Sequence, residues 1–568
     1  MWYLALACDF DETLARHGQV RPETTEALEK LRSSGRKLIL VTGREFDDLL
    51  SVYSRVELFE MIVVENGAMV YCPTTKEIKM LAEAPPEELL GGLSERRIPY
   101  SKGRAILSTG RDYDTALLET ISDLGLEHQV IFNKGSVMVL PAGINKATGL
   151  SAALDELRLS PHNVVGIGDA ENDHAFLSLC ECSFAVANAL PAIRERADFV
   201  TGGENGMGII ELAEELLSSD LRDRDQLLTR RHILLGSSNG SAIRFSPQGK
   251  NILVTGSSGG GKSTIATALL ERLMESSYQF CVVDPEGDYE SFDGAVALGN
   301  NRSAPGAEEI LKVLEDPEAN VVANLVGLGF ADRSAFLAGL LPRLQELRSR
   351  TGRPHWIVLD ETHHVLPASW DPAVLTLPKT LERMIFITVH PDQVVSTALQ
   401  SVGMIIAVGE NPRETLSKVS QAIGEPAPAT NPKTLRRGEA FLWNRESGSS
   451  YVFQIAPSRT QRRRHQRKYA EGELPPDRSF YFKGPEGKLN LRAQNLILFM
   501  QIAEGLDDDT WLYHLRRGDY SRWFREHIKD ESLGGEAARV EAAPDISAAE
   551  SRQRIKELIE QRYTLPEK

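Results

Sequence analysis

The chain has 568 residues, which is too many for one hydrophobic core, so about three or four domains are expected. An apolar fraction of 42% and a charged fraction of 25% are typical of soluble globular domains. The formal net charge of −16 makes the chain as a whole a poor ligand for polyanions, so any contact with nucleic acid has to be local.

The cysteines and the apolar runs indicate the cellular compartment of the protein. Its 5 cysteines are scattered without a Cys-x-x-Cys pair, which favours a reducing compartment and argues against a zinc site or a disulfide framework. Met1 leads straight into a strand-like segment, and no apolar run approaches the length of a membrane span. We therefore predict a cytoplasmic protein with no signal peptide and no membrane partner.

The first strand ends in two carboxylates. The apolar run Trp2 to Ala7 is followed by Cys8-Asp9-Phe10-Asp11-Glu12-Thr13. Because side chains alternate along a strand, Asp9 and Asp11 lie on the same side of its carboxyl end. Such a pair can attack an electrophile, move a proton and attract a divalent cation. The alternative is an ordinary capped strand end, since Asp and Thr also begin turns, and this stretch alone leaves both interpretations open.

A helix that begins at a proline is predicted over Pro22 to Ser33.

Three later stretches favour a catalytic role for Asp9 and Asp11 over a capped strand end. After the apolar run Leu38 to Val41, Thr42 offers a hydroxyl where a strand gives way to a helix, a suitable place for a phosphate oxygen. Lys146 adds one positive charge. Beyond the run Val164 to Ile167, the segment Gly168-Asp169-Ala170-Glu171-Asn172-Asp173 adds carboxylates of the kind that Mg²⁺ binds.

This order of motifs resembles the haloacid dehalogenase (HAD) superfamily of phosphatases, in particular its Cof-type and sucrose-phosphatase-like branch, which Glu65-Asn66-Gly67-Ala68 also resembles. The resemblance implies that Asp9 is the nucleophile and that Asp11 is the general acid and base. It implies that Thr42 and Lys146 hold the phosphoryl oxygens. Mg²⁺ would be held by Asp9, the backbone carbonyl of Asp11, Asp169 and Asp173. Intact motifs do not prove turnover, so an inactive relative is the alternative.

The resemblance also indicates how the first part of the chain is divided. The roughly one hundred residues between Thr42 and Lys146 exceed what a doubly wound fold needs as a connection. We expect an α+β cap inserted at about 76–142 in a Rossmann-like HAD domain over 1–217. In this family such a cap folds over the active site and selects small substrates. The charged segment 218–231 is predicted to be a linker, with helix as one conformation that it can adopt.

A phosphate-binding loop lies near the start of the second predicted domain, 232–457, which we call the P-loop domain. The strand Ile252 to Thr255 precedes Gly256-Ser257-Ser258-Gly259-Gly260-Gly261-Lys262-Ser263-Thr264, and a helical pattern follows. This is G-x-x-x-x-G-K-[ST] in its required context, in which backbone N–H groups and Lys262 hold the phosphates of ATP and Ser263 holds Mg²⁺. The alternative is a chance glycine-rich turn.

A second pair of acids distinguishes an ATPase from a kinase. The apolar strand Trp356 to Leu359 ends in Asp360 and Glu361. Asp360 would support the Mg²⁺ shell, and Glu361 would polarise the attacking water, which a kinase does not need. His363 and His364 follow after Thr362, and solvated residues at a helix start are the favoured interpretation over ligands or sensors.

The segment Asp284-Pro285-Glu286-Gly287-Asp288-Tyr289 resembles a stretch of HerA-like and FtsK-type ATPases with RecA-like P-loop domains, and Thr388 ends a strand where they carry a polar sensor. The N-terminal β-barrel of the HerA family is not evident, which puts DNA translocation in doubt. These ATPases act as rings, so a homo-oligomer is expected, with Arg436 and Arg437 as candidate donors of an arginine to the neighbouring site.

The last unit, 458–568, begins with the basic run Arg459 to Lys468. We interpret the run as an internal clamp or a solvated face rather than a nucleic-acid contact. Aromatic residues and helical periodicity then predict a small, mainly helical domain.

Three functions are compatible with these motifs. The favoured one is a Mg²⁺-dependent phosphatase for a small phosphorylated metabolite, of which a sugar phosphate is one example, regulated or assembled by an ATP-hydrolysing module. The alternative is a nucleic-acid-processing motor with an attached phosphatase, which a cap over Asp9 disfavours. A regulatory scaffold whose oligomeric state is set by ATP binding is the third.

Overall fold

The computed structural model describes residues 1–133, 135–257, 260–300, 302–369, 381–429, 432, 434–458, 474, 476, 478–528 and 530–563. The chain divides into two compact units, Met1–Pro457 and Ser458–Lys568. Over the described residues, none of the helices combines the length and the apolar character needed to span a bilayer. All five cysteines are free thiols.

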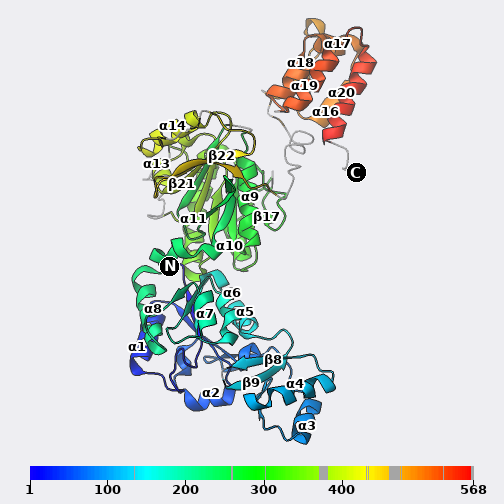
Figure 1. The fold of residues 1–568 in the computed structure, drawn as a ribbon. Coiled ribbons are helices and arrows are strands. Elements are labelled where there is room, and N and C mark those ends of the chain that lie inside the picture. Colours follow the sequence, from blue (N-terminus) through cyan, green and yellow to red (C-terminus); the bar gives the residue numbers. More distant parts are fainter. Residues whose placement is uncertain are drawn as a thin grey trace. The chain divides into compact units, whose positions relative to one another are not determined.

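The first unit contains two large sheets, and the first of them carries the HAD motifs (Figure 1). Its strand order is β12-β11-β10-β1-β2-β3-β4-β5, and all neighbours pair in parallel except β3–β4 and β4–β5. The strands are β1 (Ala5–Cys8), β2 (Lys37–Val41), β3 (Met61–Val64), β4 (Met69–Cys72), β5 (Glu77–Met80), β10 (Val164–Gly168), β11 (Cys182–Ala185) and β12 (Phe199–Val200).

Helices cover this sheet because they bury apolar stripes against it. Helix α1 (Pro22–Ser33) starts at a proline and buries Ala27, Leu28 and Leu31, so the predicted helix is confirmed at both ends. The others are α2 (Phe46–Val52), α5 (Lys146–Leu157), α6 (His174–Leu179), α7 (Pro191–Arg196) and α8 (Gly206–Ser219).

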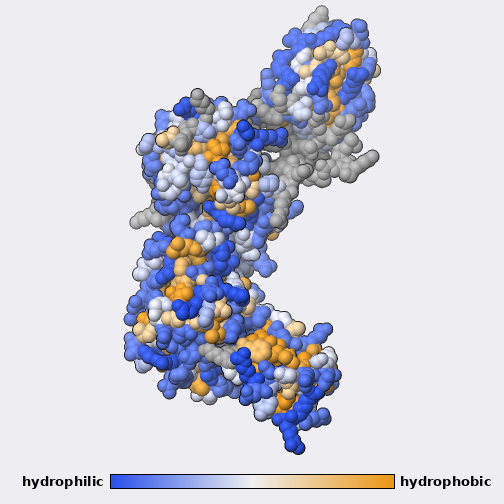
Figure 2. Space-filling view, in the orientation of Figure 1, coloured by the Kyte–Doolittle hydropathy of each residue, from blue (hydrophilic) through white to orange (hydrophobic). Residues whose placement is uncertain are grey.

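A separate four-stranded sheet of order β6-β7-β9-β8 forms the cap. Its elements are α3 (Glu87–Glu95), β6 (Ser101–Lys102), β7 (Leu107–Gly110), α4 (Asp114–Asp123), β8 (His128–Asn133) and β9 (Ser136–Pro141). The hairpin of β4 and β5 extends the main sheet to Met80, so the separate sheet lies beyond that residue rather than from 76 onward. Figure 2 shows hydrophobic surface at the position of the cap. Leu118 and Phe132 are among the exposed large hydrophobic residues of this part of the chain.

The segment expected to be a linker is folded down onto the first sheet. It forms two 3₁₀ helices, Arg222–Leu227 and Thr229–Arg231, and buries Leu221 and Leu228. Arg230 and Arg231 donate hydrogen bonds to the carbonyl oxygens of Cys180 and Glu181. Two of the charged residues that suggested a linker therefore fix the segment in place.

The second sheet has eleven strands in the order β14-β13-β23-β22-β21-β15-β20-β19-β16-β18-β17. The strands from β21 to β17 in this order are parallel, as a RecA-like domain requires, and the rest are antiparallel. The strands are β13 (Ile233–Ser238), β14 (Ser241–Phe245), β15 (Asn251–Gly256), β16 (Phe280–Asp284), β17 (Val296–Leu298), β18 (Val321–Asn324), β19 (Trp356–Leu359), β20 (Met384–Thr388), β21 (Val402–Val408), β22 (Glu439–Asn444) and β23 (Ser450–Ile455). The helices are α9 (Lys262–Glu275), α10 (Ala307–Leu314), α11 (Phe330–Thr351), α12 (Thr362–Val365), α13 (Ser396–Gln400) and α14 (Pro412–Ile423).

The second unit is mainly helical around an aromatic core, which confirms the predicted class. Its elements are β24 (Phe480–Phe482), β25 (Leu491–Ala493), α16 (Leu496–Glu504), α17 (Asp508–Arg516), α18 (Asp519–Glu526), α19 (Glu531–Glu541) and α20 (Ala548–Tyr563). Trp511 stacks on Tyr520 and Phe499 on Trp523, with ring centroids 4.4 and 5.2 Å apart. The basic run Arg459 to Lys468 lies outside the described residues.

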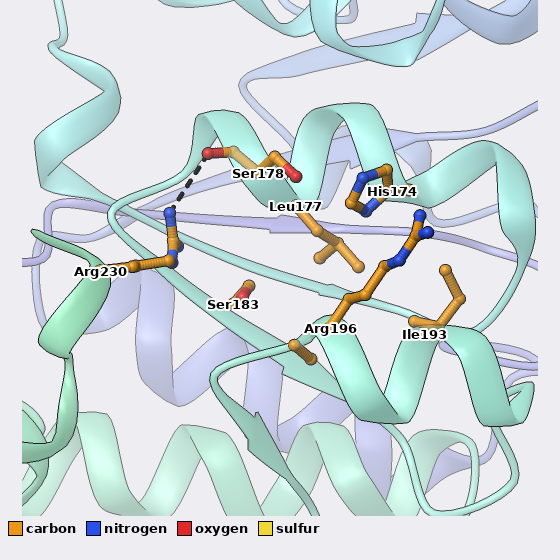
Figure 3. A pocket seen from close by; sticks show the side chains of 8 residues that line it. His174, Leu177, Ser178, Ser183, Ile193, Arg196 and Arg230 are labelled. Atoms are coloured by element: carbon orange, nitrogen blue, oxygen red, sulfur yellow. Dashed lines mark hydrogen bonds between the residues drawn. The ribbon is translucent and has the colours of Figure 1, made fainter.

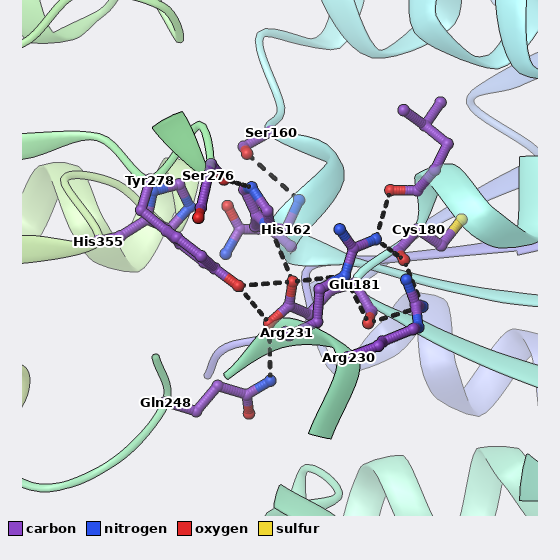
Figure 4. A network of polar contacts seen from close by, with 12 residues as sticks. Ser160, His162, Cys180, Glu181, Arg230, Arg231, Gln248, Ser276, Tyr278 and His355 are labelled. Carbon is purple, nitrogen blue, oxygen red and sulfur yellow. Dashed lines mark hydrogen bonds and ion pairs between the residues drawn. The ribbon is translucent and has the colours of Figure 1, made fainter. Parts of the chain in front are cut away.

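The two sheets of the first unit meet through a buried polar network (Figure 4). Glu181, fully buried, accepts hydrogen bonds from His162 Nδ1 at 2.6 Å and from the Tyr278 hydroxyl at 3.0 Å. The ring of His162 stacks on that of Tyr278 with centroids 3.9 Å apart, and its Nε2 donates to the carbonyl oxygen of Ser276. His162 and Glu181 precede β10 and β11, and Tyr278 precedes β16, so the amino ends of the two sheets face each other.

We expect Glu181→Ala to destabilise the first unit by about 3 kcal/mol, because it leaves His162, Arg231 and the Tyr278 hydroxyl buried without their common acceptor. The shift of the urea unfolding midpoint measures this loss. Glu156→Ala is the matched control, since Glu156 pairs with Lys79 on the surface and both are half exposed, so its removal should cost less than about 1 kcal/mol. Equal shifts for the two variants would contradict the assigned role of Glu181.

The Glu181 carboxylate also makes the stability of the first unit depend on pH. Burial alone would raise the pKa of Glu181, but His162, then Arg231 and Tyr278, hold it below its ordinary value. A carboxyl whose pKa is lower in the folded chain stabilises the fold above the unfolded value of about 4.3, and this contribution is lost as the pH falls below it. The difference in midpoint between wild type and Glu181→Ala should therefore shrink on acidification.

Candidate active sites

The first site lies where the parallel strands β1 and β10 end side by side. Asp9 follows β1, and its backbone N–H donates to the carbonyl oxygen of Ile167 at 3.0 Å. Asp169 follows β10, and Asp173 comes from the 3₁₀ turn after it. All three carboxylates are buried, and one oxygen of each lies within 4.8 Å of the others. The carboxyl edge of the sheet thus gathers three acids that are far apart in the sequence.

Lys146 reaches into this cluster from the first residue of α5. Its Nζ lies 2.6 Å from Asp9 Oδ1 and 2.5 Å from Asp173 Oδ1. Asn145 begins the helix with a capping box and fixes where Lys146 starts. Gly67 packs against this helix start, because a Cβ there would lie 1.8 Å from the carbonyl oxygen of Asn145.

The charges of the cluster do not balance. Three carboxylates against one ammonium leave a formal charge of −2 in a buried site. Burial and then Asp173 raise the pKa of Asp9, while Lys146 acts in the opposite direction. Burial alone would lower the pKa of Lys146, but Asp173 and Asp9 raise it. Buried carboxylate oxygens with unbalanced charge are the donor set that Mg²⁺ takes, so the residues fit this ion.

The outer residues of the cluster hold it in position. Asp173 Oδ2 accepts hydrogen bonds from the backbone N–H groups of Asp169 and Ala170 at 2.8 and 2.9 Å. The Thr13 hydroxyl donates to Asp169 Oδ1 at 3.1 Å. Of the predicted metal ligands, the structure brings together the side chains of Asp9, Asp169 and Asp173. The role of the Asp11 backbone carbonyl stays a prediction.

Asp11 is paired with Arg44, which the sequence reasoning did not single out. Arg44 donates two hydrogen bonds to the Asp11 carboxylate, at 2.8 and 2.7 Å, and one to Asp48 at 2.6 Å. The side chain of Asp11 is 38% exposed, unlike the buried Asp9. The sequence could have indicated this pairing, because Arg44 follows Thr42-Gly43 at the end of β2, the strand next to the one that precedes Asp11.

Thr42 is buried at the end of β2, beside a pair of amides. Its Oγ1 accepts from the backbone N–H of Arg44 at 3.1 Å. Asn172 donates to Asn66 Oδ1 at 2.8 Å, and a Cβ on Gly43 would lie within 3.3 Å of both amides. The predicted phosphate oxygen site is thus a compact group of hydroxyl, backbone and amide functions next to Asp9's strand.

Glu65 ties the cap to this group. It is fully buried with φ at 52°, and its carboxylate accepts from the backbone N–H groups of Arg104, Ala105 and Ile106 at 2.9, 2.7 and 3.2 Å. Asn66, the next residue, donates to Met138 of β9. A buried carboxylate with three backbone donors is a strong anchor, so the cap loop 104–106 is held over the β2–β3 edge of the site.

The second site is built at the carboxyl ends of β15, β20 and β19, which are neighbours in the sheet. Gly256 ends β15 with φ at 153°, and a Cβ there would lie 2.1 Å from the carbonyl oxygen of Val408. Gly261 caps α9 in the left-handed region, and Lys262, Ser263 and Thr264 form its first turn. Lys262 Nζ donates to the carbonyl oxygens of Gly256 and Ser257 at 3.1 and 3.0 Å. Gly259, also predicted for this loop, lies outside the described residues.

Asp360 and Glu361 follow β19 and face the lysine of the loop. Asp360 is buried, and Glu361 adopts a left-handed conformation with φ at 37°. Burial lowers the pKa of Lys262, and the charges of Glu361 and Asp360 partly offset this. The predicted acids and the predicted phosphate loop therefore belong to one site.

One favoured interpretation is wrong. His363 and His364 are not solvated, because only 9% and 17% of their side chains are exposed. His363 Nδ1 lies 3.0 Å from Thr388 Oγ1, at the end of β20. Sequence reasoning missed this because the neighbouring strand that covers the histidines arrives from twenty-five residues further along the chain.

A small cavity of about 120 Å³ lies apart from both sites (Figure 3). It is enclosed by α6, α7, β11 and the packed segment that carries Arg230, which donates to the carbonyl oxygen of Ser178. His174 and Arg196 line it, but the three clustered carboxylates do not. It has the character of a packing defect between helices rather than of a reaction site.

Two known families match the first unit, one in the part that forms the first sheet and one in the part that forms the second. The model of haloacid dehalogenase-like hydrolases matches residues 6–89 and 117–212, and that of the central domain of helicase HerA matches residues 249–339. Phosphoglycolate phosphatase 2 of Saccharolobus solfataricus is 29% identical over 225 residues, 38% of this chain and 94% of the relative. A phosphoglycolate phosphatase of Halorubrum lacusprofundi is 30% identical over 206 residues, 34% of this chain and 89% of the relative.

Solved structures are also similar to the first part of the chain. A haloacid dehalogenase-like hydrolase from Bacteroides thetaiotaomicron is 20% identical with a TM-score of 0.34 and covers 38% of this chain and 99% of its own. The buried carboxylates and Lys146 lie inside residues 6–89 and 117–212, which the hydrolase family model matches. Through its first part the chain belongs to the haloacid dehalogenase-like hydrolases, as a phosphoric monoester hydrolase joined to a HerA-type P-loop domain.

Proposed function

We propose that the chain is a Mg²⁺-dependent phosphatase of a small phosphorylated metabolite, regulated by an ATP-hydrolysing module. The observation that carries the proposal is the buried group of Asp9, Asp169 and Asp173 around Lys146, closed by a cap that Glu65 holds in place. Mg²⁺ bound to these carboxylates supplies the positive charge that draws a phosphate into a site of formal charge −2.

The reaction divides between two carboxylates. Lys146 engages Oδ1 of Asp9, so Oδ2 is the oxygen that attacks phosphorus and forms an aspartyl-phosphate while the P–O bond to the leaving group breaks. Asp11 gives its proton to the leaving oxygen and then takes one from the water that attacks the same phosphorus, which restores Asp9 and releases phosphate. Arg44 orients Asp11 through its two hydrogen bonds and must loosen them when Asp11 transfers a proton.

The cap supports a small substrate. The loop 104–106 is bound to Glu65, and the apolar residues Ala105, Ile106 and Met138 pack with Ala68 beneath the cap. This arrangement admits a metabolite more easily than a polymer end. The similarity to phosphoglycolate phosphatases makes phosphoglycolate the first substrate to test, with sugar phosphates next.

The P-loop module binds ATP and Mg²⁺ through Lys262, Ser263 and Asp360, and Glu361 orients the attacking water. Helix α9 begins at Lys262 and is followed by Ser276, whose carbonyl oxygen is bound by His162 of the phosphatase core. This contact gives nucleotide binding a direct mechanical route to the first sheet. It supports regulation as the role of the module.

A motor acting on nucleic acid is the second candidate, favoured by the match of residues 249–339 to the central domain of a helicase. In that case the neighbouring copy of an oligomer would contribute an arginine, with Arg436 and Arg437, both exposed, as candidates. A screen of phosphorylated metabolites, with and without ATP, separates the two functions.

Asp9→Asn should abolish phosphate release from p-nitrophenyl phosphate and from the best metabolite, because the amide cannot attack phosphorus. ATP hydrolysis should persist, since the two sites lie on different sheets. Phosphate release and ATP turnover are measured on the same preparation. Loss of both activities would contradict two separate sites.

Lys262→Ala should remove ATP hydrolysis, because the loop loses the charge that binds the β and γ phosphates. Glu361→Gln should keep ATP bound but lower its turnover by about 10² or more, since it removes only the group that orients water. Nucleotide affinity and steady-state rates distinguish the two effects. Wild-type turnover by Glu361→Gln would return a kinase to consideration.

DNA, double- or single-stranded, should not stimulate ATP hydrolysis at physiological salt, because a chain of net charge −16 has to concentrate its basic residues to bind a polyanion. The ATPase rate is measured with and without DNA across a salt series. A strong, salt-sensitive stimulation that disappears when Arg462, Arg463 and Arg464 are replaced by Ala would instead favour the motor.

A further inference from the structure

A short segment after β11 contacts both loops that carry the carboxylates of the phosphatase site. The side-chain Nδ2 of Asn188 donates to the backbone carbonyl oxygen of Glu12, in the loop after β1, at 2.8 Å. The backbone N–H of Leu190 donates to the backbone carbonyl oxygen of Asp169, in the loop after β10, at 2.9 Å. Two residues of one segment therefore fix the loops that follow two neighbouring strands relative to each other.

The orientation of the Asn188 amide follows from its partners. Its Oδ1 accepts from the backbone N–H of Asn205 at 2.8 Å, and because an N–H can only donate, Nδ2 is the atom that faces Glu12. The side chain of Asn205 faces two acceptors of Glu12, the carbonyl oxygen at 3.0 Å and Oε2 at 3.1 Å, so its amide nitrogen points there as well. The Glu12 carbonyl is thus held by the amides of Asn188 and Asn205, which we call the amide clamp.

Glu12 is a position where the backbone needs such support. Its φ of 60° lies in the left-handed region, which a residue with a Cβ adopts only at an energetic cost. Its side-chain carboxylate also accepts from the backbone N–H of His17 at 3.0 Å. Hydrogen bonds to both the carbonyl and the carboxylate of Glu12 therefore hold the loop in a conformation that it would not prefer by itself.

The residues on either side of Glu12 belong to the proposed metal site. Thr13 shares the clamped peptide unit, and its buried hydroxyl donates to Asp169 Oδ1 at 3.1 Å. Asp11, on the other side, has the backbone carbonyl that is predicted to bind Mg²⁺. Rotation of the Glu12 backbone would move these two groups relative to each other, because its φ and ψ are the soft rotations that join their peptide units.

We propose that Asn188 is a positioning residue of the phosphatase, which sets where the Asp11 carbonyl and the Thr13 hydroxyl lie relative to Asp169. The inference rests on the Mg²⁺ site of the proposed function. Asn188 acts through the backbone of Glu12 and not on the reacting atoms. It therefore determines the affinity for the metal rather than the attack on phosphorus.

The test measures Mg²⁺ binding by calorimetry on the full chain, without nucleotide or substrate. Asn188→Ala removes the donor, whereas Asn188→Asp keeps the shape and the acceptor for Asn205 but turns a carboxylate oxygen toward the Glu12 carbonyl. Both variants should raise the Kd for Mg²⁺ about tenfold, as the loss of a group that orients metal ligands does. Binding that is lost in Asp169→Asn identifies the phosphatase site.

Turnover of p-nitrophenyl phosphate gives a second readout. At a Mg²⁺ concentration near the wild-type Kd, both Asn188 variants should lose several-fold in rate, because less of the enzyme holds the metal. Saturating Mg²⁺ should restore most of kcat, with KM for the substrate nearly unchanged.

Asn163→Ala is the matched control, because Asn163 makes the same kind of bond at the opposite end of the first sheet. It is fully buried, and its Nδ2 donates to the carbonyl oxygen of Trp2, before β1, at 2.9 Å. This variant should lower the urea unfolding midpoint but leave the Kd for Mg²⁺ unchanged.

An unchanged Kd in both Asn188 variants, an equal rise in Asn163→Ala, or a loss of kcat that saturating Mg²⁺ does not restore would each overturn the inference. Failure of the proposed function would look different, because the wild type itself would then show no Mg²⁺ binding that Asp169→Asn removes.

Discussion

The buried Glu181 determines how the two catalytic halves of the first unit are related. It lies at the amino ends of parallel strands in both sheets and accepts hydrogen bonds from both, from His162 on one side and Tyr278 on the other. A buried carboxylate tolerates few alternative arrangements of its partners, so the contact has one geometry. Because the amino ends are joined, the carboxyl ends, where both reaction sites lie, face away from each other. The phosphatase and the P-loop module can therefore each bind a ligand without obstructing the other.

Both sites follow one rule of α/β architecture, in which ligands bind beyond the carboxyl ends of parallel strands. In the phosphatase, β1 and β10 bring Asp9 next to Asp169, and a lysine from α5 neutralises only part of the charge. In the P-loop module, β15, β20 and β19 bring the lysine loop, Thr388 and the acids together. The first site is organised by unbalanced charge, the second by a glycine-rich turn and two acids that follow β19.

The cap is held to the core through backbone hydrogen bonds. Glu65 gathers three N–H groups of the loop 104–106, and its neighbour Asn66 contacts both the cap and Asn172 of the site. The cap is thus connected through Asn66 to the amide group of Asn172 beside Thr42. The positive φ values of Glu65, Asn66 and Gly67 make this corner costly for most other sequences.

The sequence by itself determined the local elements and the kinds of chemistry. The proline start of α1, the phosphate loop with its lysine, and the acids at strand ends are encoded within a few residues of each other, so local rules predicted them. What depended on distant segments was decided only by the tertiary structure. Arg44 meets Asp11, Glu65 meets the cap loop, and Thr388 covers His363 because sheet order brings remote strands together. The charged segment 218–231 was expected to be a linker, and the two histidines were expected to be solvated, because polarity predicts exposure on average. Burial with hydrogen-bond partners supplied by another strand reverses that expectation, and no local pattern records which strand will be the neighbour.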